Sequence, residues 1–101
     1  MGRRSSITLE DLRVLLSALQ NRVDDVPPAN SKAFRQEIEM LISFSTQLFG
    51  MDPVALSTLD VASSKLVVHQ PGVALTKIES VLVRRARWEK NNSADVLTIG
   101  L

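Results

Sequence analysis

The chain of 101 residues has no cysteine, one histidine and four glycines. Without cysteine it can form no disulfide, no thiolate metal site and no cysteine nucleophile, and this composition fits a reducing compartment such as the cytoplasm. The glycines are too scattered to form a phosphate-binding loop, and no serine stands in a G-x-S-x-G motif. The chain also lacks the run of about 18 apolar residues that a membrane-spanning helix requires.

The single histidine, His69, stands in the sequence VVHQPG beside a predicted turn. Histidine can act as a general base or a metal ligand, but no second histidine and no acidic residue stands at a ligand spacing from it. Asp24 and Asp25 precede prolines at a helix end, and Glu37 and Glu39 point in different directions on a helix. We therefore expect a structural role for His69, and we predict no catalytic residue, no metal site, no cofactor and no small-molecule substrate.

The overall composition is that of an ordinary globular domain. Apolar residues make up 45% of the chain and charged residues 23%, and the net charge is only +1. These values argue against disorder, and the length suits one domain with a modest core. We predict a flexible basic arm at residues 1–6, a single helical domain at residues 7–91 and an extended tail at residues 92–101.

The first helix has clear start and stop signals. Thr8 is a good N-cap, and Asp11 three residues later completes a capping box. Apolar residues then recur at spacings of three and four, which predicts an amphipathic helix: they are Leu9, Leu12, Leu16, Leu19, Val23 and Val26. Pro27 and Pro28 end it. The stripe fits either a bundle helix or a short dimeric coiled coil, and the bundle is favoured because short helices need tertiary packing.

The stretch at residues 34–49, FRQEIEMLISFSTQLF, predicts the central helix of the fold. Its main apolar face spans about 120° of arc and consists of Phe34, Ile38, Leu41, Ile42, Leu48 and Phe49. Ala33, Met40 and Phe44 widen this arc to about 200°, which is too wide for one neighbouring helix. Asn30 or Ser31 is expected to cap this helix, which forms an antiparallel hairpin with the first because the connection is short.

The remaining helices are less sharply bounded. Gly50 is expected in a left-handed conformation at the end of the central helix, and Asp52 and Pro53 begin the next one. A helix to about Val67 is favoured, with one face formed by Ala55, Leu59, Ala62 and Leu66. Residues 65–69 also have strand character.

The last helix is predicted from Val73 or Thr76 to Asn91, although Pro71 could equally be its first residue. Its core stripe is Leu75, Ile78, Leu82 and Ala86. Together these patterns predict an all-α fold, a small four-helix bundle with three long helices and one shorter or irregular helix, a flexible N-terminal arm and an extended apolar C-terminal tail.

Surplus apolar surface leads to the first functional hypothesis. The residues that the core does not obviously require are Met40 and Phe44 on the central helix and Val96, Leu97, Ile99 and Leu101 in the tail. A small domain that exposes such side chains is expected to bury them against another protein chain. The sequence therefore predicts a non-enzymatic interaction or assembly module, as a homo-oligomer or part of a larger assembly, with these residues at the interface.

A basic stretch gives the alternative hypothesis, nucleic-acid binding. In residues 81–90, VLVRRARWEK, Arg84 and Trp88 are four apart, so a guanidinium can stack on the indole. The candidate phosphate-binding set is Arg3, Arg4, Lys77, Arg84, Arg87, Trp88 and Lys90. The near-neutral total charge weakens this reading, as does the general preference for cations in the last turns of a helix.

Overall fold

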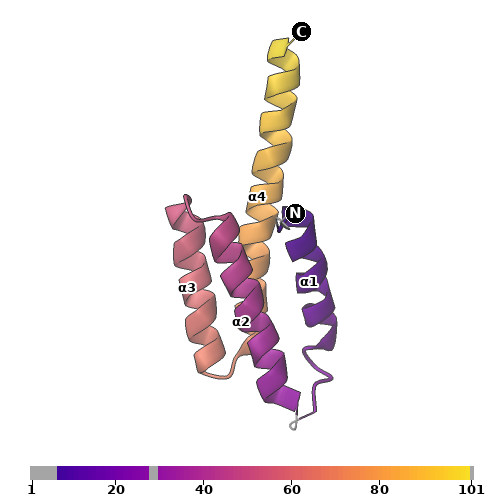
Figure 1. Ribbon diagram of the computed structural model, residues 1–101, viewed down its shortest axis with the longest axis vertical. Coiled ribbons are helices and arrows are strands. Elements are labelled where there is room, and N and C mark those ends of the chain that lie inside the picture. The colour runs from indigo at the N-terminus through magenta and orange to yellow at the C-terminus, as the bar shows by residue number, and fades with distance from the viewer. Residues whose placement is uncertain (1–6, 28–29, 101) are drawn as a thin grey trace, which may run out of the picture.

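The computed structural model describes residues 7–27 and 30–100, and for residues 91–100 it describes only the backbone. Four helices account for this part of the chain (Figure 1), namely α1 (Leu9–Arg22), α2 (Ser31–Leu48), α3 (Pro53–Val67) and α4 (Pro71–Gly100). The described ranges contain no strand. The prediction of a small all-α bundle of four helices is therefore confirmed. The arm at residues 1–6 lies outside the described residues.

The helices run alternately up and down (Figure 1). Residues 23–30, 49–52 and 68–70 connect them, and connections this short place successive helices antiparallel to each other. α1 packs against α2 and α4, α3 packs against the same two helices, and α2 also touches α4 across the bundle. The bundle is therefore a square in which α1 and α3 occupy one diagonal and α2 and α4 the other.

Capping explains where two of the helices begin. The Thr8 hydroxyl accepts a hydrogen bond from the Asp11 backbone N–H, and the Asp11 carboxylate accepts one from the Thr8 N–H, both at 3.1 Å. The Asp52 carboxylate accepts from the N–H groups of Val54 and Ala55 at 3.0 and 3.2 Å. Both caps were predicted. Asn30 occupies the N-cap position of α2, but its side chain makes no capping hydrogen bond.

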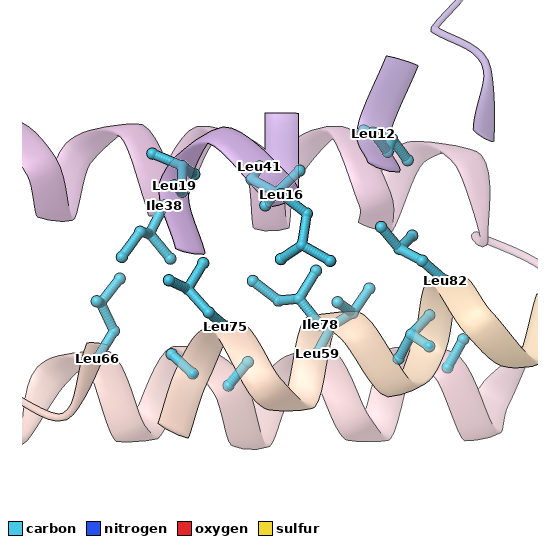
Figure 2. Close-up of a cluster of buried hydrophobic side chains, with 14 of the residues drawn as sticks. Leu12, Leu16, Leu19, Ile38, Leu41, Leu59, Leu66, Leu75, Ile78 and Leu82 are labelled. Carbon is cyan, nitrogen blue, oxygen red and sulfur yellow. The ribbon is translucent and has the colours of Figure 1, made fainter. Parts of the chain in front are cut away.

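All four helices contribute to one apolar core. Figure 2 shows leucine and isoleucine side chains of every helix meeting between the ribbons. The most extensive contact joins α3 to α4, and these two helices also bury the small side chains of Ala55, Ala62 and Ala74. The predicted face of α3 is buried as expected, and α3 is a regular helix rather than a strand.

Two helix ends differ from the sequence expectation. α1 ends at Arg22, so Val23 and Val26 lie beyond the helix, although both still pack against the core. α4 begins at Pro71, the earlier of the predicted starts, and continues to Gly100 where an extended tail was expected. No proline or glycine interrupts residues 91–99, and the described residues offer no sheet edge for pairing. A continued helix satisfies its own backbone hydrogen bonds.

His69 closes α3 in an unusual backbone conformation. Its φ of 63° is left-handed, the only positive φ among the described non-glycine residues. The Gln70 N–H donates to the Lys65 carbonyl at 2.9 Å, and the His69 N–H donates to the Leu66 carbonyl at 3.1 Å. These two bonds form a Schellman motif with His69 in the position that glycine normally occupies. The left-handed residue expected at Gly50 is not found there.

Replacing His69 by glycine should therefore stabilise the protein. Glycine removes the steric cost of Cβ at positive φ but gains freedom in the unfolded chain, so the expected net increase in unfolding free energy is about 0.5–1 kcal/mol. Urea unfolding measures this difference. His69→Ala is the control, because it removes the imidazole but keeps Cβ and should give no increase. Equal stability of the two variants would contradict the explanation.

Candidate protein-interaction surfaces

The flank of α2 that contains Met40 and Phe44 lies on an open face between α1 and α2. Met40 is 56% exposed, and Leu15 stands across from it on α1 with 42% exposed. Phe44 is half-buried and packs against the core. A groove of about 160 Å³ lies on this face, and we call it the α1–α2 groove. Its lining residues are Leu15, Ala18, Leu19, Arg22, Glu37, Met40, Leu41 and Phe44. α3 and α4 contribute no residue to this lining.

An ion pair joins the two sides of the α1–α2 groove. The Arg22 guanidinium donates two hydrogen bonds to the Glu37 carboxylate, Nη1 to Oε1 at 2.9 Å and Nη2 to Oε2 at 3.1 Å. Donation to the Glu37 carboxylate raises the pKa of the Arg22 guanidinium. The guanidinium also lies 5.3 Å from the centre of the Phe34 ring. Such an exposed pair adds little stability, but it fixes one positive and one negative charge beside an apolar groove.

A second hollow lies where α4 leaves the bundle, beside the turn between α2 and α3. We call it the α4 cleft; its volume is about 450 Å³, and its lining residues are Phe49, Met51, Asp52, Pro53, Ala55, Thr58, Ser80, Val81, Arg84, Arg85 and Trp88. Phe49, Ala55 and Val81 are buried, whereas Met51 is 97% exposed and Trp88 is 53% exposed. The cleft therefore has an apolar floor with a methionine, a tryptophan and a basic residue at its edge. Sequence reasoning did not assign Met51 or Phe49 to a site.

The guanidinium that stacks on the Trp88 indole belongs to Arg85, so the expectation that Arg84 stacks there is wrong. The Arg85 guanidinium carbon lies 4.7 Å from the Trp88 ring centre and 5.7 Å from the Phe49 ring centre. Its Nε–H also donates to Glu89 at 3.1 Å. Arg85 follows Ile78 and Leu82 on the core-facing side of α4, so it lies over the end of the core, whereas Arg84 is turned by about 100° toward the edge of the cleft. The spacing of Ile78, Leu82 and Arg85 is the sequence signal that could have identified this position, and the sequence analysis did not use it.

The predicted basic residues of α4 remain unpaired within the described part of the chain. Arg84, Arg87 and Lys90 are exposed and Lys77 is half-buried. The ion pairs among described side chains involve Arg13, Arg22 and Arg85 instead. Arg3 and Arg4, the proposed second contact with nucleic acid, lie outside the described residues.

The predicted tail residues Val96, Leu97 and Ile99 lie on the last turns of α4, and Leu101 lies outside the described residues. α4 has 30 residues against 14 in α1, 18 in α2 and 15 in α3. Its final turns project past the ends of the other helices (Figure 1). Val96 follows Ile78 by about five turns at roughly 3.6 residues per turn, so the backbone of α4 brings both to the same side of the helix.

Arg85→Ala should loosen the α4 cleft. The change removes the cation between two rings and the ion pair with Glu89, so the expected loss of unfolding free energy is about 1 kcal/mol. The emission of Trp88, the single tryptophan, should shift to the red as the indole gains water contact. Thermal unfolding and fluorescence measure the two effects. Arg84→Ala matches the change in helix propensity and should alter neither value; equal effects of both variants would refute the role assigned to Arg85.

Two further features are absent from the part of the chain that the structure describes. No group of three or more His, Asp or Glu side chains there could hold a metal ion. No described helix has the length and apolarity needed to cross a membrane. In comparisons with known proteins, the chain matches no protein-family model, no curated protein and no solved structure.

Proposed function

We propose that this protein is a non-enzymatic assembly module that associates with a second copy of itself through the α1–α2 groove. The observation that carries this proposal is the exposure of Met40 and Leu15 beside the groove. The bundle buries a complete core without them, so neither side chain is required for folding. Burial of large apolar side chains by a partner favours association, by about 25 cal/mol for each Å² of apolar surface removed from water.

The shape and charge of the groove favour a second copy as the partner. Met40 and Leu15 protrude, and the hollow between the helices can receive a protruding side chain. A two-fold contact requires such a self-complementary face, because each copy supplies the same residues. Arg22 and Glu37 lie side by side at this face, so an antiparallel pair of copies places each arginine near the glutamate of the other.

The projecting end of α4 supports a larger assembly. At about 1.5 Å per residue, the 30 residues of α4 span about 45 Å, roughly 20 Å more than the other helices. Isolated helical segments shorter than about 12–15 residues are marginal in water, so packing against another chain would stabilise this end. We include Val96, Leu97, Ile99 and Leu101 in the assembly surface. The cysteine-free composition accords with a cytoplasmic location.

Sedimentation velocity over a wide concentration range tests self-association. The wild-type protein should show a concentration-dependent dimer, and Leu15→Glu combined with Met40→Glu should raise the dissociation constant about tenfold or more, because each copy would bury two charges in the contact. Val61→Glu with Val73→Glu is the matched control, since it places two glutamates on exposed valines of α3 and α4. A wild-type monomer at every concentration would overturn the proposal.

Nucleic-acid binding is the second candidate function, and the unpaired state of Arg84, Arg87 and Lys90 favours it. These exposed cations lie on neighbouring turns of α4, where they can contact successive phosphates. The total charge of +1 supplies little long-range attraction, which is why this candidate ranks second.

Arg84→Glu with Arg87→Glu distinguishes this second candidate from the first. If α4 binds phosphates, filter binding at low salt should retain single-stranded DNA or RNA, and the double variant should lose this retention. For each phosphate contact, the logarithm of the binding constant should fall by about 0.7 for every tenfold increase in salt concentration. Lys32→Glu with Lys65→Glu, at the start of α2 and the end of α3, is the control. Absence of any retention by the wild type at low salt would exclude the candidate.

A further inference from the structure

The α4 cleft differs in chemistry from the α1–α2 groove. Its floor is continuous with the core, because Phe49 is both a cleft residue and a core residue with 1% of its surface exposed. The volume of about 450 Å³ lies within the range of about 300–1,000 Å³ typical of ligand pockets. The cleft can therefore receive a large side chain in contact with the bundle core.

The Met51 side chain has no evident structural role in the turn beside this cleft. Its neighbour Asp52 caps α3 through hydrogen bonds to Val54 and Ala55, whereas Met51 is almost entirely in water. A polar residue at position 51 would be equally compatible with this turn. A methionine at the edge of a hollow adapts its flexible, polarisable side chain to apolar ligands.

The ionised groups around the cleft leave a positive excess. The Asp52 carboxylate accepts hydrogen bonds from the start of α3, and the Glu89 carboxylate is paired with Arg85. Arg84 lines the cleft, and Arg87 stands on the next turn of α4; neither forms an ion pair with a described side chain. A ligand that carries carboxylates next to its apolar group would complement this arrangement.

We propose that the α4 cleft binds a short acidic segment of a partner protein, with a large apolar side chain of that segment between Met51 and Trp88 and its carboxylates at Arg84 and Arg87. The inference rests on the proposed function as an interaction module but uses a separate surface. A protein segment fits better than nucleic acid, because the floor of Phe49, Ala55 and Val81 is apolar and suits an aliphatic or aromatic side chain.

Titration of the wild-type protein with defined peptides tests the inference, with Trp88 emission as the readout because it is the single tryptophan. The probe is a short peptide with a Leu-Phe pair between runs of Asp and Glu. Its controls are a peptide with Lys in place of the acidic residues, an acidic peptide with Ala in place of Leu-Phe, and an oligothymidylate of similar length. The acidic Leu-Phe peptide alone should give a saturable change in emission, and its affinity should fall as salt rises.

Variants then locate the binding site. Met51→Ser and Arg84→Glu should each weaken peptide binding about fivefold or more, the loss expected for an anchoring contact. Val67→Ser, at an exposed valine of α3, and Lys32→Glu are the matched controls and should bind as the wild type does; far-UV circular dichroism confirms that all four variants fold.

Three outcomes would overturn the proposal: no peptide binding by the wild type, binding that survives both cleft variants, or tighter binding of the oligothymidylate. All three are independent of the sedimentation result, because that experiment tests the α1–α2 groove. Failure of the proposed function and failure of this inference are therefore distinguishable.

Discussion

The short connections between helices are the constraint on which the rest of the structure depends. Because each helix must turn back beside its predecessor, α2 faces α1 on one side and α3 on the other, and it also touches α4 across the core. Its buried residues Phe34, Ile38 and Leu41 nevertheless lie within about 60° of arc at 100° per residue. The wide apolar arc that the sequence shows on this helix is therefore only partly covered, because Ala33 and Met40 stay exposed.

The same constraint explains where apolar surface is left over. α1 contributes a narrow stripe of Leu12, Leu16 and Leu19 to the core, and this stripe covers only part of the flank of α2 that faces it. Met40 lies outside the covered part and remains exposed beside Leu15. α4 is longer than the other helices, and its last turns project from the bundle (Figure 1).

Sequence reasoning succeeded where the signal is local and failed where it depends on packing. The caps at Thr8 and Asp52 and the stripes of the helices follow from residues a few positions apart, and they predicted the four helices. By contrast, Arg84 and Arg85 are both within reach of Trp88, and only the rotation of α4 against Phe49 decides which of them stacks. The left-handed His69 was missed because the sequence pattern assigns such a position to glycine, whereas Gly50 does not adopt this conformation. The exposed groove beside Met40 was an open question in the sequence because it depends on how far α1 covers α2.

Phe49 connects the core of the bundle with the α4 cleft. Its ring is buried in the core, forms part of the cleft floor and lies beside the Arg85 guanidinium. A side chain that enters the cleft would therefore add apolar contacts to the end of the core rather than to an isolated surface patch. A ligand that binds only the folded state stabilises it in proportion to RT ln(1 + [L]/Kd), so occupation of the cleft would strengthen the packing of α4 against α2 and α3. Since Met40 and Phe44 belong to the same helix as the residue preceding Phe49, α2 supports both surfaces, and each can be occupied without displacing the other.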